Sequence, residues 1–324
     1  MSTPSPSNPV RVYYLSSGLI GAPILDALRS DGRIALTGVG SQPDRPVGRK
    51  QVFTPTAFAR YALEQGCEVE RIRSVNTPEF HERLESSGTE VLLVVSFGQL
   101  LKAKLLELPP CGCVNIHASL LPRYRGACPI NAAILNGDAQ TGVSFMRMDV
   151  GLDTGPVYRT FTEPILPDDT TNVLEARLGR LSALHVGEML WAIAREGLPC
   201  TPQPPTTAPN VRKITKDDGA VNWSQSARQI SNMIRAYIPW PRAHTYVPVQ
   251  GQLRRIQLLE ARAEEGSSPV GQAGTVLPGA ADELCVLCGS GILHIHRLIP
   301  EGRKEMSAAD FLRGNPVLPG SVLE

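Results

Sequence analysis

The sequence predicts an α/β fold: a doubly wound, mostly parallel sheet of the Rossmann-like type, followed by a small antiparallel β-barrel of the OB-like type. Three observations predict it. The first part of the chain alternates short apolar runs with stretches of helical spacing, as parallel strands joined by helices do. A stretch with five prolines then interrupts this pattern at 198–210. After it, short runs of strand type are separated by glycine turns, which is typical of small barrels.

Length and composition favour a soluble protein of two domains. The chain has 324 residues, and a domain usually takes about 100–200. The net charge is +1, so any RNA binding must come from local patches. No apolar run reaches the ~18–20 residues that span a bilayer, and the first residues lack a signal-peptide pattern, so we expect a cytoplasmic protein. The expected divisions are a disordered leader at 1–9, a first domain at 10–197, a linker at 198–212 and a second domain at 213–324.

The chain opens with the alternation of a doubly wound sheet. The apolar run at 10–15 predicts a buried strand, and a Ser-Ser-Gly turn separates it from helical spacing at 19–28. A second strand is predicted at 34–39. The turn between strand and helix contains no GxGxxG, so we expect no dinucleotide at this position.

The middle of the first domain supplies its central strands. Val91 to Val95 is apolar throughout, as burial on both faces of a parallel sheet requires. Other expected elements are helices at 54–66, 78–86 and 129–136, strands at 113–117, 143–148 and 157–164, and a long helical region at 168–196 that covers the sheet.

The second domain begins near Lys213. Its apolar spacing predicts a helix at 226–237 and a last helix beginning at Glu305. Short strands are expected at 245–249, 253–259, 274–276, 284–287 and 291–298. Between residues 213 and 262 there are eight Lys or Arg and three Asp or Glu, which favours a basic face.

Two motifs carry the candidate chemistry. Asn115 and His117 alternate on one strand and therefore share a face. Farther along, Asp149 and Asp153 lie in a glycine-bounded turn, DVGLDTG. An amide donor, an imidazole and a carboxylate suffice for acyl transfer to an amine: they hold an oxyanion, move a proton and orient the ring. Taken singly, Asn-x-His is usually structural, and such a turn suggests a calcium loop or an Asx turn.

The cysteines do not suggest a metal site. There are seven, an odd number that argues against a disulfide framework and for a reducing compartment. Cys285-x-x-Cys288 lacks a second CxxC at zinc-ribbon spacing and lies in an apolar run, so we expect buried strand thiols and no metal.

The stretch NIHASLLPRYRGACPI followed by MDVGLDTG resembles the signature of the folate-dependent formyltransferases, and among them the methionyl-tRNA formyltransferases. The resemblance runs from about Val12 to Gly320. It implies a catalytic trio of Asn115, His117 and Asp153, and 10-formyltetrahydrofolate as the formyl donor. It also implies folate contacts by Ser119, Leu120, Leu121 and Pro122. Phe97 and Leu100 suit either the core or the pterin, and the resemblance implies the pterin.

The same resemblance implies an initiator methionyl-tRNA as the partner. The loop SQPDRPVGRK matches the insertion loop that reaches the acceptor arm, so Arg45, Arg49 and Lys50 are expected to contact RNA. Lys213 and Lys216 are expected to contribute from the second domain, and the protein to act as a monomer. Arg123 and Arg125 suit the folate or the RNA equally.

Three other functions use some of the same residues. A sugar-nucleotide N-formyltransferase and a 10-formyltetrahydrofolate hydrolase would both keep the trio. A non-catalytic RNA-binding protein would not need it. The basic loop and the second domain favour tRNA over the first two, and the intact trio disfavours the third.

Overall fold

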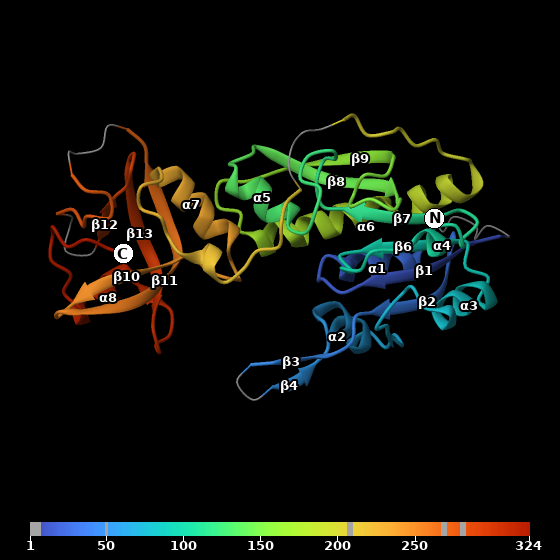
Figure 1. Ribbon diagram of the computed structural model, residues 1–324, viewed down its shortest axis with the longest axis horizontal. Helices are drawn as coiled ribbons and strands as arrows, with labels where there is room; N and C mark the ends of the chain where they lie inside the picture. The colour runs from blue at the N-terminus through green and yellow to red at the C-terminus, as the bar shows by residue number, and fades with distance from the viewer. Residues whose placement is uncertain (1–7, 49–50, 206–209, 267–270, 279–282) are drawn as a thin grey trace. The chain divides into compact units, whose positions relative to one another are not determined.

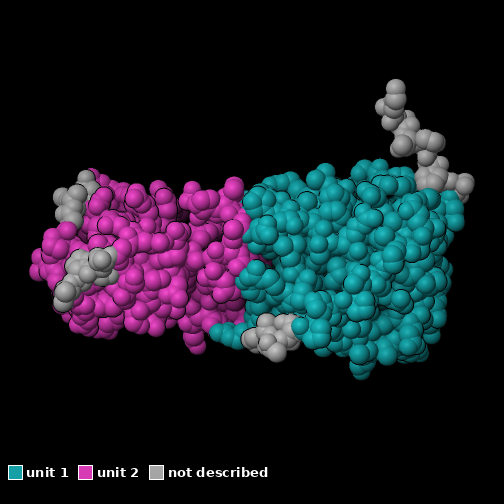
Figure 2. Space-filling model, turned by 90° about the horizontal axis from the view of Figure 1, so that it is seen from above, with its two compact units in different colours: residues 1–129, 140–164, 174–212 teal, residues 130–139, 165–173, 213–324 magenta. Residues whose placement is uncertain are grey.

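The computed structural model describes residues 8–48, 51–205, 210–266, 271–278 and 283–324. The chain divides into two compact units, coloured teal and magenta in Figure 2. The first comprises 1–129, 140–164 and 174–212, and the second comprises 130–139, 165–173 and 213–324. The second unit therefore takes two short segments from within the stretch expected to form the first domain.

A seven-stranded sheet forms the centre of the first unit, in the order β5-β2-β1-β6-β7-β8-β9 (Figure 1). The pairs from β5 to β7 are parallel, and β8 and β9 are antiparallel. Because β1 pairs with β2 on one side and β6 on the other, the sheet is doubly wound, as predicted. Its strands are β1 (Val10–Ser16), β2 (Ile34–Ser41), β5 (Glu70–Arg71), β6 (Val91–Val95), β7 (Cys113–His117), β8 (Gln140–Arg147) and β9 (Val157–Pro164).

Adjacent tyrosines of β1 show how both faces of this sheet are covered. Neighbouring strand residues point to opposite faces. Tyr13 packs edge-on against Phe80 of α3 (Pro78–Ser86), with ring centroids 5.4 Å apart. Tyr14 packs in the same way against Phe58 of α2 (Ala57–Glu64), and its hydroxyl donates to the carbonyl oxygen of Gly21 in α1 (Gly21–Ser30) at 2.9 Å. With helices on both sides, all five residues of β6 are buried.

The helices begin at side-chain caps that the sequence supplies. The Thr56 and Thr77 hydroxyls accept backbone N–H groups at the starts of α2 and α3, and Pro78 occupies the first turn of α3. Ser226 and Gln229 form a capping box on α7. None of the described helices combines the length and apolarity needed to cross a bilayer. The helices are α1 (Gly21–Ser30), α2 (Ala57–Glu64), α3 (Pro78–Ser86), α4 (Ala103–Leu106), α5 (Pro129–Leu135), α6 (Thr171–Arg195), α7 (Ala227–Ala236) and α8 (Ala308–Gly314).

The segment expected to be a loop after β2 contains a small hairpin. β3 (Arg45–Val47) pairs antiparallel with β4 (Val52–Thr54). A strand of three residues is too short to show an alternation of apolar and polar side chains in the sequence. Pro46 also argues against a strand except at the edge of a sheet, and β3 is an edge strand of this two-stranded sheet. The hairpin exposes apolar side chains: Phe53 is 72% exposed.

The second unit holds an antiparallel sheet in the order β10-β11-β13-β12, with β14 paired to β13. The antiparallel character predicted for this part of the chain is confirmed. Helix α7 packs against β11. A 3-10 turn, η1 (Asp217–Gly219), precedes it. The strands are β10 (His244–Val249), β11 (Gln252–Glu264), β12 (Leu284–Leu287), β13 (Ile292–Pro300) and β14 (Met306–Ser307).

Both edges of this second sheet have backbone partners from irregular segments. Residues 274–277 are hydrogen-bonded to β12 on one side and to 320–324 on the other. Glu324 in turn exchanges backbone hydrogen bonds of 2.9 and 3.1 Å with Tyr246 of β10. Neither edge strand therefore presents a fully unpaired ladder.

Candidate active site

The candidate catalytic residues lie at the carboxyl end of β7. This strand pairs in parallel with β6 and antiparallel with β8, so it is the last parallel strand before the sheet changes direction. Asn115 and His117 share one face of it and are buried, at 9% and 6% exposed. The Asn115 side chain has no hydrogen-bond partner among the residues that the structure describes, so its amide is available to a bound molecule.

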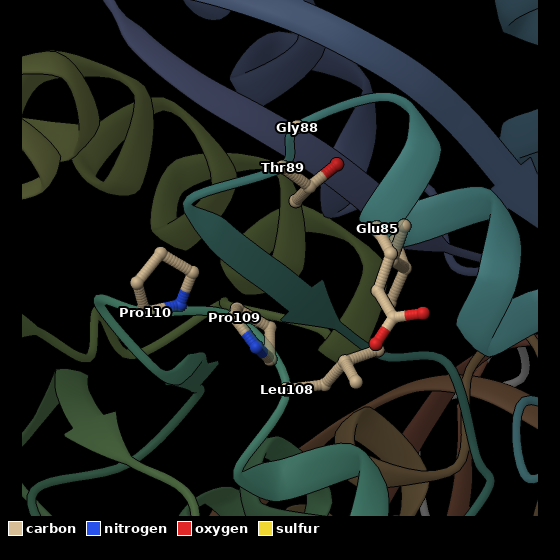
Figure 3. Close-up of a pocket in the computed structure, with 7 residues that line it drawn as sticks. Glu85, Gly88, Thr89, Leu108, Pro109 and Pro110 are labelled. Atoms are coloured by element: carbon tan, nitrogen blue, oxygen red, sulfur yellow. The ribbon is translucent and has the colours of Figure 1, made fainter.

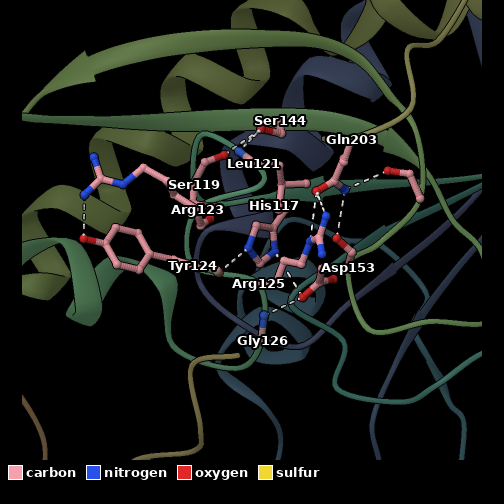
Figure 4. Close-up of polar contacts among 11 residues, drawn as sticks. His117, Ser119, Leu121, Arg123, Tyr124, Arg125, Gly126, Ser144, Asp153 and Gln203 are labelled. Carbon is pink, nitrogen blue, oxygen red and sulfur yellow. Dashed lines mark hydrogen bonds and ion pairs between the residues drawn. The ribbon is translucent and has the colours of Figure 1, made fainter. Parts of the chain in front are cut away.

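His117 and Asp153 converge from segments 36 positions apart in the sequence (Figure 4). His117 Nδ1 lies 3.7 Å from Asp153 Oδ2, and both side chains are largely buried. The backbone N–H of Gly126 donates to the same Oδ2 at 2.8 Å. Asp153 has a φ of +55°, a conformation that Asp tolerates better than most residues. The turn thus directs this carboxylate towards the imidazole.

The second ring nitrogen of His117 faces a backbone carbonyl. His117 Nε2 lies 2.9 Å from the carbonyl oxygen of Tyr124. A carbonyl oxygen only accepts hydrogen bonds, so the hydrogen-bond network assigns a proton to Nε2. Nδ1 is therefore the nitrogen that faces the carboxylate, and it is the position at which the ring can gain or lose a proton beside Asp153.

The two carboxylates of the DVGLDTG turn have different tasks. Asp149 Oδ1 accepts from the backbone N–H of Gly151 at 3.0 Å and from the Thr154 hydroxyl at 2.8 Å. These bonds close the turn on itself. A side chain on Gly155 would meet the carbonyl oxygen of Arg147 at 1.9 Å, so only glycine fits there. Asp149 shapes the turn that presents Asp153.

Gln203 is a site residue that the sequence did not reveal. Its Nε2 donates to the carbonyl oxygens of Asp153 and Gly155 at 2.9 and 2.7 Å (Figure 4). Its Oε1 accepts from Nε and Nη2 of Arg125 at 3.0 and 2.7 Å. Gln203 lies in the proline-rich segment, where no periodicity or motif marks it. One amide therefore connects the Asp153 turn to the Arg123–Arg125 region.

Arg123 and Arg125, which the sequence assigned to neither the folate nor the RNA, lie in different surroundings. Arg125 is committed to Gln203 and so belongs to the scaffold of the site. Arg123 is exposed, donates to the Tyr124 hydroxyl at 3.0 Å, and lies over the Tyr124 ring with its guanidinium carbon 5.0 Å from the centroid.

The stretch expected to line the folate site is anchored to β8. The Ser119 hydroxyl donates to the carbonyl oxygen of Arg123 at 2.6 Å, and Ser119 is fully buried. The Ser144 hydroxyl donates to the Ser119 carbonyl oxygen at 2.6 Å and accepts from the Leu121 N–H at 3.0 Å. Leu120, Leu121 and Pro122 are each partly exposed. Ser119 is thus a structural anchor, and the three residues after it present the accessible surface.

The loop after β6 separates its two candidate folate residues. Phe97 is 2% exposed and packs in the core cluster with Tyr13 and Leu101, so its side chain stabilises the fold. Any ligand contact by Phe97 must come from its backbone. Leu100, in contrast, is 65% exposed and available.

The structure describes three of the five residues expected to contact RNA. Arg45 lies on β3, is exposed, and donates to the Gln42 side chain at 2.5 Å. Arg49 and Lys50 lie outside the described residues. Lys213 and Lys216 are exposed on the second unit.

A hollow of about 260 Å³ lies at the other end of the parallel strands (Figure 3). Thr89 comes just before β6 and Pro110 just before β7, so the hollow opens at the amino ends of these strands. The trio lies at the carboxyl end, where open α/β sheets bind ligands. The hollow is therefore separate from the trio. Its lining is Leu84, Glu85, Gly88, Thr89, Leu108, Pro109 and Pro110.

Comparison with known proteins agrees with the geometry. Residues 10–185 match the formyl transferase family, and residues 213–316 match the formyl transferase C-terminal domain. The methionyl-tRNA formyltransferase of Sorangium cellulosum is 39% identical over 97% of this chain and 99% of its own length. That of Myxococcus xanthus is 40% identical over 88% of this chain and 89% of its own length.

A solved structure shows the same fold at low identity. An N-formyltransferase from Helicobacter canadensis, in complex with folinic acid and dTDP-3-aminofucose, superposes with a TM-score of 0.62 at 17% identity. The match covers 88% of this chain and 99% of that one. That likeness concerns the fold alone; the family match and the two relatives, which span nearly the full length, show that the chain belongs to the methionyl-tRNA formyltransferase family.

Proposed function

We propose that this protein transfers a formyl group from 10-formyltetrahydrofolate to the α-amino group of the methionyl residue on initiator tRNA, for translation initiation. The observation that carries the proposal is the approach of Asp153 to His117 at 3.7 Å, with Asn115 on the same strand face as His117, in a chain that matches methionyl-tRNA formyltransferases over nearly its whole length.

Each member of the trio has a role that its surroundings allow. The amine attacks the formyl carbon, a new C–N bond forms, and the formyl oxygen becomes an oxyanion. The unpartnered amide of Asn115 donates to that oxygen. The bond from the formyl carbon to folate nitrogen N10 then breaks, and the attacking nitrogen loses a proton while N10 gains one.

His117 and Asp153 handle the protons. Because Nε2 is held by the Tyr124 carbonyl, Nδ1 is the nitrogen that exchanges a proton with the reacting groups. The Asp153 carboxylate, fixed by the Gly126 N–H, stabilises the positive charge on the ring when Nδ1 is protonated.

The formyl donor binds beside this trio. We assign its contacts to the partly exposed Leu120, Leu121 and Pro122, to Leu100, and to the backbone of Phe97, because these surround the carboxyl ends of β6 and β7. An apolar wall with a few backbone groups suits a flat heteroaromatic ring. The buried Ser119 holds the wall in place through Ser144.

The tRNA is held by two regions. The β3–β4 hairpin presents Arg45, with Arg49 and Lys50 beyond the described residues, for contact with acceptor-stem phosphates. The second unit supplies Lys213 and Lys216 at the start of a stretch rich in Lys and Arg. The backbone bonds of 274–277 and 320–324 to the two edge strands support a closed, OB-like barrel for this unit. We propose a monomer acting in the cytoplasm, where charged tRNA is used.

A substrate panel tests the proposal. The full-length protein is incubated with 10-formyltetrahydrofolate and, in separate reactions, charged initiator tRNA, glycinamide ribonucleotide and a dTDP-amino sugar. We expect formyl transfer to the tRNA alone. Transfer to the amino sugar, or release of formate without an acceptor, would instead support the sugar-nucleotide or hydrolase alternatives and overturn the proposal.

A further inference from the structure

A second cluster of reactive side chains lies on the antiparallel sheet of the second unit. Cys285 of β12 is directly opposite His294 of β13, and Glu283 precedes Cys285 by two residues. Cys285 Sγ lies 3.4 Å from His294 Nδ1 and 3.7 Å from Glu283 Oε2. His294 Nδ1 and Glu283 Oε2 are 4.0 Å apart. Three different ligand types thus point at one position.

These separations are close to those of a tetrahedral zinc site. With Zn–S of about 2.3 Å and Zn–N or Zn–O of about 2.0–2.1 Å, tetrahedral angles place the ligand atoms about 3.3–3.6 Å apart. The sulfur–nitrogen distance already fits, and the sulfur–oxygen distance is within a few tenths of an ångström. Only the Glu283 carboxylate must move nearer to the imidazole, and its side chain is 53% exposed, so a change of rotamer meets little obstruction.

The other ring nitrogen of His294 has the partner that a metal-bound histidine usually has. His294 Nε2 lies 2.9 Å from Oε2 of Glu264 on β11. A carboxylate there fixes the proton on Nε2 and leaves the Nδ1 lone pair for a cation. This second contact is independent of the three candidate ligands and orients the ring towards them.

We propose that Glu283, Cys285 and His294 bind a divalent transition-metal ion, Zn²⁺ by ligand preference, with Glu264 positioning His294 and a water molecule as the fourth ligand. One thiolate, one imidazole and one carboxylate suit zinc, whereas the sulfur disfavours magnesium and calcium. Binding breaks the Cys285 S–H bond, and the proton leaves to solvent. The inference does not depend on formyl transfer.

The expectation of no metal came from judging the cysteines as a CxxC pair. The structure separates them: Cys288 is buried, donates to the carbonyl oxygen of Val286 at 3.6 Å, and is not part of the cluster of Glu283, Cys285 and His294. The ligand set instead crosses between strands, with a spacing that no short motif marks.

The competing explanation is a chain of ordinary hydrogen bonds from thiol to imidazole to carboxylate. It predicts the same contacts in the absence of metal and no affinity for cations. The two explanations differ in what happens when zinc is offered to the protein.

The test is a zinc titration of full-length, chelator-treated protein. Equilibrium dialysis with metal analysis should give one zinc per chain, and cobalt substitution should give a thiolate-to-cobalt charge-transfer band. Cys285→Ser should abolish both, whereas the matched variant Cys288→Ser should retain both. Glu264→Gln should weaken zinc binding by about 10–100-fold without changing the stoichiometry.

Three results would overturn the proposal: no zinc bound by the unmodified protein, unchanged zinc binding in Cys285→Ser, or equal loss in both cysteine variants. Circular-dichroism melting checks that each variant is folded. If Cys285→Ser does not fold, Glu283→Gln replaces it, because this exposed side chain lies before β12 and its loss of charge must lower zinc affinity if it is a ligand.

Discussion

Gly126 donates its backbone N–H to Oδ2 of Asp153 at 2.8 Å, and this is the oxygen that faces His117. Gly126 has a φ of +113°, and a side chain on it would meet the carbonyl oxygen of Val211 at 2.3 Å. Only glycine therefore fits at position 126. A backbone group, which a substitution cannot simply delete, thus fixes the carboxylate of the trio.

Asn115→Ala should lower turnover by about 10²–10³-fold, the usual loss when one oxyanion donor is removed. The side chain makes no hydrogen bond among the described residues, so melting temperature should change little. Steady-state kinetics with charged initiator tRNA and a thermal melt measure the two quantities. Asn115→Asp, which is nearly the same shape but cannot donate when ionised, should be equally impaired. Near-normal turnover in either variant would reject the oxyanion role.

Asp153→Asn should lower turnover by about 10²–10⁴-fold, the range for loss of acid–base assistance. The amide oxygen still accepts from Gly126, so the turn is preserved and only the charge beside His117 is lost. The matched control is Asp149→Asn, because an amide oxygen also accepts the two bonds that Asp149 makes. Equal activity in the two variants would show that the charge of Asp153 is not used.

Gln203→Leu should lower turnover by about 10-fold or more, since it leaves two carbonyl oxygens and the Arg125 guanidinium without their partner. The loss should appear in turnover rather than in the Michaelis constant for tRNA, because the residue positions Asp153. Gln65→Leu, at an exposed position, is the control. A Gln203→Leu enzyme with normal turnover would mean that the Asp153 turn holds its shape without this amide.

Arg45→Ala should weaken tRNA binding and leave turnover at saturating tRNA unchanged. Loss of one phosphate contact reduces the slope of log affinity against log salt by about one. Filter binding over a series of salt concentrations measures this slope. Arg180→Ala removes another exposed arginine of the first unit, on α6, and should not change it. If both variants alter the slope alike, the β3–β4 hairpin has no special role.

Glu90→Gln should destabilise the protein by about 1 kcal/mol at neutral pH. Arg195 donates to both carboxylate oxygens of Glu90 at 2.8 Å, and these bonds hold the pKa of Glu90 below its usual range. A lowered folded-state pKa gives stability that is present above the unfolded value, about 4.3, and is lost as pH falls through the folded value. Denaturant melts should therefore differ at pH 7 and converge in acid. A difference that persists in acid would contradict this.

The sequence located the central strands well because their signal is local. The expected strands at 91–95 and 113–117 coincide with β6 and β7. The uninterrupted apolar run of β6 is typical of a parallel strand covered on both faces, whereas β7 is marked by polar residues at every second position from Asn115 to His117. The β3–β4 hairpin was missed because its strands are short, exposed and broken by proline.

Only part of the candidate site could be predicted from the sequence. The pairing of His117 with Asp153 came from the family resemblance, because no periodicity relates residues so far apart. Gln203 and the Glu283–Cys285–His294 cluster depend on contacts between separate segments. The sequence also did not indicate which loop side chains are buried. Phe97 and Leu100 lie in the same loop, yet Phe97 is buried and Leu100 is exposed.

The second unit includes short segments from the middle of the chain. Asn131 and Thr171 both donate to the carbonyl oxygen of Ala236, and Arg235 donates to that of Asp169. A gene shortened after codon 212 would leave Asn131 and Thr171 without these acceptors. The two parts of the chain on either side of the proline-rich stretch are therefore not independent modules. A chimaera with a single crossover in that stretch would also need residues 130–139 and 165–173 that match its new second unit.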